Sequence, residues 1–190
     1  MSRLPFALLA FRLLLGPLLL LAASDGQTGW WVVAGLAAGI FSDILDGMLA
    51  RRLGLASVRL RRVDSLIDSI FFLFVAAAAW AAHSETLLAH GVLAAGMLAL
   101  WAVSQLPALL KFGKAAAYHA YSAKAAGLAL LAAGVRLFGL GQAGWVLDAA
   151  LWLAILSHLE RIAITLALPA WRTDVAWVGA AWAERRGPEN

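Results

Sequence analysis

DILDGMLAR at residues 43–51 and DSLID at residues 64–68 are the two acidic stretches around which this chain must fold. Their aspartates come in pairs, Asp43 with Asp46 and Asp64 with Asp68. On a helix, residues three or four positions apart share one face, with Cβ atoms about 5–6 Å apart. Both stretches border apolar sequence, where an uncompensated charge costs several kcal/mol. We therefore expect the four carboxylates to serve a function.

Four carboxylates that face one another repel, so the site needs positive charge. Carboxylate oxygens are hard ligands that suit Mg²⁺, Mn²⁺ or Ca²⁺. Two divalent ions would balance four negative charges, and we predict a site for two Mg²⁺ or Mn²⁺ ions. The alternative is that the acids only form interfacial salt bridges with nearby arginines, which are Arg51, Arg52, Arg59, Arg61 and Arg62.

The composition is that of a membrane protein. Of 190 residues, 63% are hydrophobic and 14% charged, whereas soluble domains are about half apolar and a quarter charged. Six apolar stretches meet the length of about 20 residues that a membrane-spanning helix needs. They are residues 4–23, 29–50, 63–83, 87–109, 118–138 and 144–168. The sequence predicts an all-α bundle of six transmembrane helices with a polar, metal-binding cavity at the cytoplasmic side.

Basic residues are distributed unevenly between the two ends of the spans, which predicts the orientation. Cytoplasmic loops carry an excess of Lys and Arg. One side holds Arg3, Arg51, Arg52, Arg59, Arg61, Arg62, Lys111, Lys114, Lys124, Arg161, Arg172, Arg185 and Arg186, and the other holds Arg136. Both termini and the acidic site are therefore expected in the cytoplasm. Arg12 lies inside the first span and either reaches the acidic site or snorkels to the interface.

The chain divides into a membrane domain, residues 1–170, and a cytoplasmic tail, residues 171–190. The apolar residues of the tail fall on one helical face, and they are Trp171, Val175, Val178 and Trp182. This pattern predicts an interfacial amphipathic helix, with Thr173 or Asp174 as its N-cap.

Taken together, the two acidic stretches resemble the signature of the CDP-alcohol phosphatidyltransferase family, D-x2-D-G-x2-A-R-x8-G-x3-D-x3-D. Seven of its eight fixed positions match, at Asp43, Asp46, Gly47, Ala50, Arg51, Asp64 and Asp68. The eighth is Leu60, where the family has glycine. The added bulk implies a rearranged nucleotide pocket, a lower affinity, or a nucleotide other than CDP.

The resemblance implies roles for the matching residues. Asp43, Asp46 and Asp64 would hold the metal pair, and Asp68 would support the metals and act as general base on the acceptor hydroxyl. Gly47, Ala50 and Arg51 would line the nucleotide pocket. The reaction would move a phosphatidyl group from CDP-diacylglycerol to an alcohol and release CMP, as part of phospholipid biosynthesis.

The acceptor is suggested by basic residues. Lys124 lies one turn inside the fifth span, where a lysine is costly unless it meets an anion. A phosphorylated polyol such as glycerol 3-phosphate would supply that anion, with Arg59 and Arg62 as further candidates for binding it. The rival interpretation is that Lys124 pairs with an acid or with a lipid phosphate.

Two other functions stay open: a CDP-choline/ethanolamine-type phosphotransferase that acts on diacylglycerol, and a catalytically inactive membrane binding or scaffold protein. The expected partners are a CDP-linked lipid, an alcohol acceptor and the bilayer, without nucleic acid. Many members of the family form homodimers, which the sequence does not test. The length resembles that of bacterial phosphatidylglycerophosphate synthases, which implies a bacterial inner or cell membrane. Residues 1–23 also fit a cleaved signal peptide, but Arg12 and Pro17 resemble the family's first-helix pattern, which favours retention.

Overall fold

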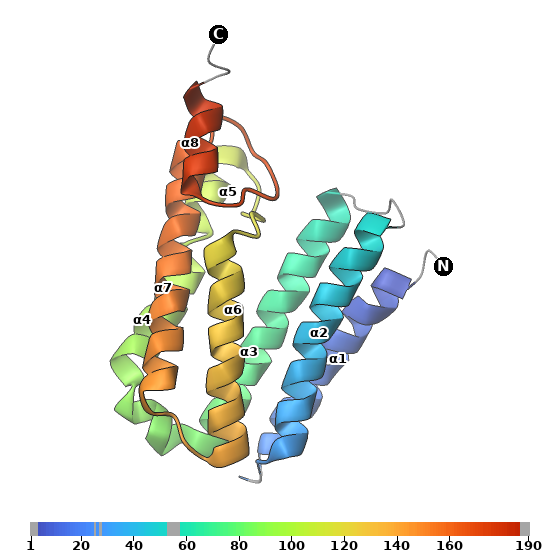
Figure 1. The fold of residues 1–190 in the computed structure, drawn as a ribbon, viewed down its shortest axis with the longest axis vertical. Helices are drawn as coiled ribbons and strands as arrows, with labels where there is room; N and C mark the ends of the chain where they lie inside the picture. Colours follow the sequence, from blue (N-terminus) through green and yellow to red (C-terminus); the bar gives the residue numbers. More distant parts are fainter. Residues whose placement is uncertain (1–3, 25, 27, 53–57, 187–190) are drawn as a thin grey trace. The chain divides into compact units, whose positions relative to one another are not determined.

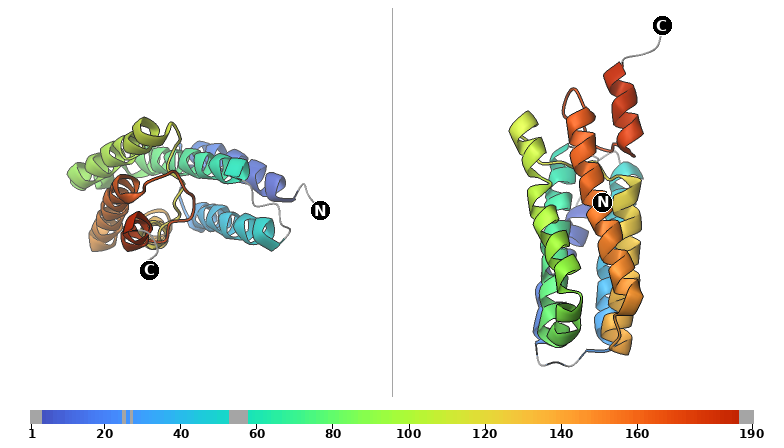
Figure 2. Two further views of the ribbon diagram at one scale, coloured as in Figure 1. Left: turned by 90° about the horizontal axis from the view of Figure 1, so that it is seen from above. Right: turned by 90° about the vertical axis from the view of Figure 1, so that its left-hand side faces the viewer.

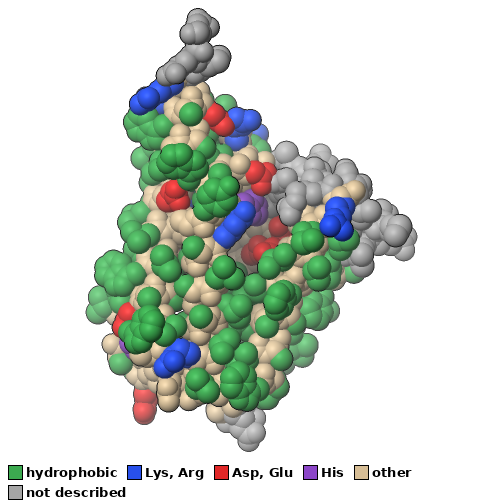
Figure 3. Space-filling model, viewed as in Figure 1, with side chains coloured by type: hydrophobic (Ala, Val, Ile, Leu, Met, Phe, Trp, Pro, Cys, Tyr) green, Lys and Arg blue, Asp and Glu red, His purple; other side chains and the backbone are tan. Residues whose placement is uncertain are grey.

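The computed structural model describes residues 4–24, 26, 28–52 and 58–186, and most of them are helical (Figure 1). Six of the helical segments are long and apolar enough to cross a membrane, which confirms the predicted all-α fold. Hydrophobic side chains cover much of the face shown in Figure 3, as expected for helices that lie in lipid. The chain is a multi-pass integral membrane protein.

The helices form two compact units, and each unit combines separate parts of the sequence. The first unit contains Met1–Ala89 and Gly134–Ala143. The second unit contains His90–Ala133 and Gly144–Asn190. The predicted division into a membrane domain, residues 1–170, and a cytoplasmic tail, residues 171–190, is a different division from these two units. It stays a prediction.

Three long helices and one short π-helix build the first unit. They are α1 (Leu4–Ala23), α2 (Trp30–Arg52), α3 (Val58–Ala89) and η1 (Val135–Gly139). The views in Figures 1 and 2 agree that α1, α2 and α3 lie side by side, and α1 packs on both of the others.

Glycines allow these three helices to approach closely. A Cβ atom added at Gly16 would lie 3.0 Å from the ring of Phe74 on α3, and one added at Gly39 of α2 would overlap the buried ring of Phe71. Small residues at helix interfaces are typical of membrane proteins, where close packing replaces the hydrophobic effect. The contact between Gly39 and Phe71 is about one helical turn from both Asp43 and Asp68. It therefore holds the acidic parts of α2 and α3 at the same level.

Five helices build the second unit: α4 (Gly91–Val103), α5 (Leu106–Phe112), α6 (Tyr121–Gly134, whose last residue belongs to the first unit), α7 (Gly144–Ala167) and α8 (Val178–Arg186). α7 is the central helix, because α4, α5 and α8 all pack against it. A buried cluster joins α5, α7, α8 and the segments between them, and it includes Ala108, Tyr118, Ile164, Leu168, Val175 and Ala181.

The predicted tail helix is shorter than its apolar pattern indicated. It begins at Val178 rather than at Thr173 or Asp174, because the preceding residues pair with another segment. Thr173 forms an isolated parallel β-bridge with Ala117, and the indole of Trp171 donates a hydrogen bond to the Ala115 carbonyl oxygen at 3.1 Å. Val175 is therefore buried in the cluster of the second unit and does not belong to a lipid-facing stripe.

The third span is predicted to end at residue 83 and the fourth to begin at residue 87, but the structure has a bend here in place of a loop. The chain stays helical to Ala89 and bends at His83, which has non-helical backbone angles. The His83 ring contacts the Thr28 hydroxyl, with Nε2 and Oγ1 3.1 Å apart, and lies edge-on to the ring of Phe138. These tertiary contacts within the first unit hold the bend, which lies at the predicted end of the third span.

Candidate active site

The four aspartates of the acidic motif lie on two helices of the first unit, Asp43 and Asp46 on α2 and Asp64 and Asp68 on α3. As their spacing predicted, each pair shares one helix face, because all four carboxylates contact the side chain of Arg12 on α1. Neighbouring helices thus bring together charges that are up to 56 residues apart in the sequence.

Arg12 lies in the middle of this acidic cluster. Its Nη1 atom is 3.4 Å from an oxygen of Asp43 and 3.2 Å from an oxygen of Asp64, and it also donates to Asp68. Its Nη2 atom donates to Asp46, and its Nε atom donates to the hydroxyl of Ser42 at 3.3 Å. The Arg12 side chain is only 1% exposed, so the alternative in which it snorkels to the interface is wrong.

Arg12 supplies part of the positive charge that the two predicted metal ions would otherwise provide, and the alternative in which it reaches the acidic site is the one that the structure shows. One guanidinium and four carboxylates give these five side chains three more formal negative charges than positive ones. Arginine is suited to such a position because its five N–H donors form a rigid fork that reaches several carboxylates at once. Taken by themselves, these five side chains remain acidic and attract cations.

Three of the four aspartates form a triad that can hold a metal ion. One carboxylate oxygen each from Asp43, Asp64 and Asp68 lies within 4.8 Å of the others. Asp46 is outside this triad, and its side chain is 5% exposed compared with 44% for Asp43. The convergent set therefore includes Asp68 in place of Asp46, which the resemblance had grouped with Asp43 and Asp64.

The chemistry of the triad fits a hard divalent cation. Its donors are all carboxylate oxygens, which suit Mg²⁺ and Mn²⁺, and the negative charge left after pairing with Arg12 favours a cation. The residues present therefore fit the metal that the family resemblance implies. The number of ions and their identity stay predictions.

The proposed nucleotide-binding residues lie at the motif end of α2. Gly47 follows Asp46 directly and is half-buried. The backbones of Ala50 and Arg51 belong to the last turns of α2, and their side chains lie outside the described part of the structure. Their role in binding a nucleotide stays a prediction.

Leu60, the position at which the family has glycine, lies in the first turn of α3 and is half-buried. A helical backbone does not require glycine, which is in fact unfavourable inside helices. The exchange therefore changes the bulk at this position without straining the backbone.

The proposed acceptor-binding residues belong to both units. Lys124 lies in the first turn of α6, in the second unit, where it is exposed and its ammonium group is 5.4 Å from the centroid of the Tyr121 ring. Arg59 and Arg62 lie in the first turns of α3, and their side chains are outside the described part of the structure. Acceptor binding by these residues stays a prediction.

Two features of the site were missed or left open by the sequence analysis. Ser42 accepts a hydrogen bond from Arg12 and donates one to the Gly39 carbonyl oxygen at 2.7 Å. In the sequence, the only indication that Ser42 belongs to the site was its position next to Asp43. For Arg12, the signal was a single arginine inside an apolar span, which is costly without a partner.

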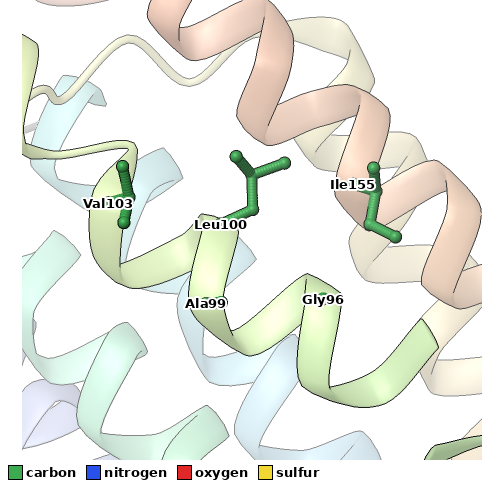
Figure 4. A pocket seen from close by; sticks show the side chains of 5 residues that line it. All are labelled: Gly96, Ala99, Leu100, Val103 and Ile155. Atoms are coloured by element: carbon green, nitrogen blue, oxygen red, sulfur yellow. The ribbon is translucent and has the colours of Figure 1, made fainter. Parts of the chain in front are cut away.

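An apolar groove lies elsewhere, between α4 and α7 of the second unit (Figure 4). It has a volume of about 360 Å³ and is lined by Gly96, Ala99, Leu100, Val103 and Ile155. These side chains have no polar group that binds or activates a phosphate, so the groove contributes nothing to the acidic site.

Comparison with known proteins identifies the family. A sequence model of the family described as CDP-alcohol phosphatidyltransferase matches residues 2–165. No curated protein and no solved structure matches the chain significantly. The family match covers α1, α2 and α3 with their acidic cluster and continues almost to the end of α7. The chain is a member of the CDP-alcohol phosphatidyltransferase family.

Proposed function

We propose that this protein transfers a phosphatidyl group from CDP-diacylglycerol to an alcohol and releases CMP. Family membership supports the general reaction, a transfer from a CDP-alcohol by a membrane enzyme. The observation that carries the proposal is the convergence of Asp43, Asp64 and Asp68 at one point of the first unit. A pyrophosphate needs a cationic partner, and this triad can hold one.

The residues of the site have distinct roles in this proposal. Asp43, Asp46 and Asp64, with Asp68, are the candidates for holding Mg²⁺ or Mn²⁺, and Gly47, Ala50 and Arg51 line the nucleotide pocket. A bound divalent ion would neutralise the pyrophosphate and make CMP a better leaving group. Asp68 accepts the proton of the acceptor hydroxyl while the oxygen of that hydroxyl forms a bond to the phosphorus that carries diacylglycerol. The bond from that phosphorus to CMP breaks, and CMP leaves with the bonding electrons.

The proposed setting is a bacterial-type cell membrane with the acidic site and both termini in the cytoplasm. The excess of Lys and Arg at that end of the spans supports this orientation. A fusion of a periplasmic-active reporter enzyme to the C-terminus should therefore be silent, and activity of that fusion would contradict the orientation.

Radiolabelled donors test the reaction itself. The purified protein should transfer label from CDP-diacylglycerol to glycerol 3-phosphate and should leave CDP-choline with diacylglycerol unreacted. Heated protein is the blank, and the Asp68→Asn variant is a folded control. Turnover of CDP-choline alone would replace the proposal with the choline-type reaction, and no turnover of either donor would favour a binding or scaffold role.

Lys124 should contribute to binding a phosphorylated acceptor. Replacing Lys124 with glutamine should raise the KM for glycerol 3-phosphate at least several-fold, because the anion loses a charged partner, and should leave the KM for CDP-diacylglycerol unchanged. Initial rates over a range of each substrate measure both constants.

The matched control for this substitution is Lys114→Gln, which removes the same charge from the same unit. The Lys114 ammonium group lies 4.9 Å from the centroid of the Trp171 ring, and we assign it no acceptor role. An unchanged acceptor KM in Lys124→Gln would contradict the proposal, as would faster turnover with serine or free inositol than with their phosphorylated counterparts.

A further inference from the structure

The guanidinium of Arg12 and the predicted metal ion need the same space. Nη1 of Arg12 contacts one oxygen of each triad member, at 3.4 Å for Asp43 and 3.2 Å for Asp64, and it also donates to Asp68. The triad has oxygens within 4.8 Å of one another. An Mg²⁺ ion binds oxygens at about 2.0–2.1 Å, so an ion shared by these three carboxylates would need the space among them that Nη1 fills.

We infer that Arg12 and a divalent metal ion compete for the triad, and that Arg12 is a built-in cation that holds the aspartates together when no metal is bound. This inference rests on the metal site of the proposed function.

The remaining contacts of Arg12 show how the side chain is retained when Nη1 is displaced. Nη2 pairs with Asp46, and Nε donates to Ser42 at 3.3 Å. Neither residue belongs to the triad. A turn of the planar guanidinium about the line through Nη2 and Nε would keep these two contacts and move Nη1 away from the triad's oxygens. On this basis, Asp46 is the partner of Arg12 rather than a ligand of the triad's metal ion.

Electrostatics explain why the metal-free protein needs Arg12. Asp43, Asp64 and Asp68 lie near enough to repel strongly, and Asp46 is almost fully buried. Removing one partner of a buried ion pair leaves the other charge uncompensated and is strongly destabilising. Without Arg12, the four carboxylates would lose a cation that contacts all of them, and a divalent ion would then gain more from binding.

Direct measurement of Mn²⁺ binding tests the inference without relying on activity. The full-length protein in detergent micelles is titrated with Mn²⁺, and the free ion is quantified from its electron paramagnetic resonance signal. Arg12→Gln should lower the Kd for Mn²⁺ roughly 5- to 150-fold, the usual range for coupling between two ligands. The Kd of Arg12→Lys for Mn²⁺ should lie between those of the wild type and Arg12→Gln. A lysine ammonium keeps the charge, but it is a point charge that cannot span the triad, Asp46 and Ser42.

Thermal unfolding gives a second measurement on the same samples. In EDTA, Arg12→Gln should melt at a lower temperature than the wild type, and saturating Mn²⁺ should raise its Tm by more than it raises that of the wild type. The matched control is Arg136→Gln, which removes the same charge from η1 in the first unit. The Arg136 side chain donates to Gln142, so this control should leave the Kd for Mn²⁺ unchanged.

The possible results separate this inference from the proposed function. Equal or weaker Mn²⁺ binding by Arg12→Gln and Arg12→Lys would overturn the competition and leave the metal site standing. A lack of Mn²⁺ binding in the wild type and in both variants would overturn the competition and the metal site together. Should Arg12→Gln not fold even with Mn²⁺, Arg12→Lys decides alone, and an unchanged Kd in that variant overturns the inference.

Discussion

Excess EDTA should reduce phosphatidyl transfer to the background rate, and added Mg²⁺ or Mn²⁺ should restore it. The triad of Asp43, Asp64 and Asp68 is a set of hard oxygen donors, and Arg12 alone leaves the acidic cluster with a formal negative charge. A doubly negative pyrophosphate would be repelled by that charge. Release of labelled CMP, measured before and after the metal is restored, tests this expectation.

The fold should survive the same treatment, because Arg12 keeps the carboxylates together. Circular dichroism in EDTA should therefore show an unchanged helical signal while activity is lost. Activity that persists undiminished in EDTA would contradict the metal requirement. Loss of helical signal would attribute the inactivation to unfolding instead of to the missing ion.

Asp68→Asn should lower kcat by about 10²–10⁴-fold, the usual contribution of a general base. Asparagine keeps an oxygen that can coordinate a metal ion, but its amide cannot accept the proton of the acceptor hydroxyl. The KM for CDP-diacylglycerol should therefore change little. Steady-state kinetics at saturating Mg²⁺ measure both constants.

The comparison variant is Asp43→Asn, which changes another member of the same triad. Asp43 has no proposed proton-transfer role, so this variant should mainly raise the Mg²⁺ concentration needed for half-maximal activity. Near-normal turnover in Asp68→Asn would exclude Asp68 as the general base. If both variants lose the same amount of activity and both recover it fully at high Mg²⁺, Asp68 contributes to metal binding alone.

Local sequence patterns predicted the helices and the aspartate pairs, because both depend on short-range spacing. Runs of about 20 apolar residues identified the six spans, and separations of three and four residues placed Asp43 with Asp46 and Asp64 with Asp68. Burial in lipid makes such patterns unusually informative, since each backbone polar group must be satisfied inside its own helix. The fold class was therefore predictable without any knowledge of the tertiary contacts.

The features that the sequence did not predict depend on contacts between distant segments. Arg12 pairs with residues 30 to 56 positions away, and its partner depends on how α1 packs against α2 and α3. The start of α8 was displaced because Thr173 pairs with Ala117, although the apolar spacing of the tail was helical. The periodicity of apolar residues describes one segment at a time. It does not reveal that residues of a helical pattern can pair with a distant segment instead.

The order of the helices along the chain has a consequence for biogenesis. α1, α2 and α3 follow one another, so the acidic cluster is complete once residue 89 has been made. At about 5–20 residues per second, synthesis of residues 90–190 takes on the order of 5–20 s. During that interval four carboxylates lie at the border of the lipid, where unpaired charge is costly. Arg12 on α1 contacts all four carboxylates and leaves the ribosome before them. A nascent chain with Arg12→Gln should therefore be retained longer by the insertion machinery than the wild type.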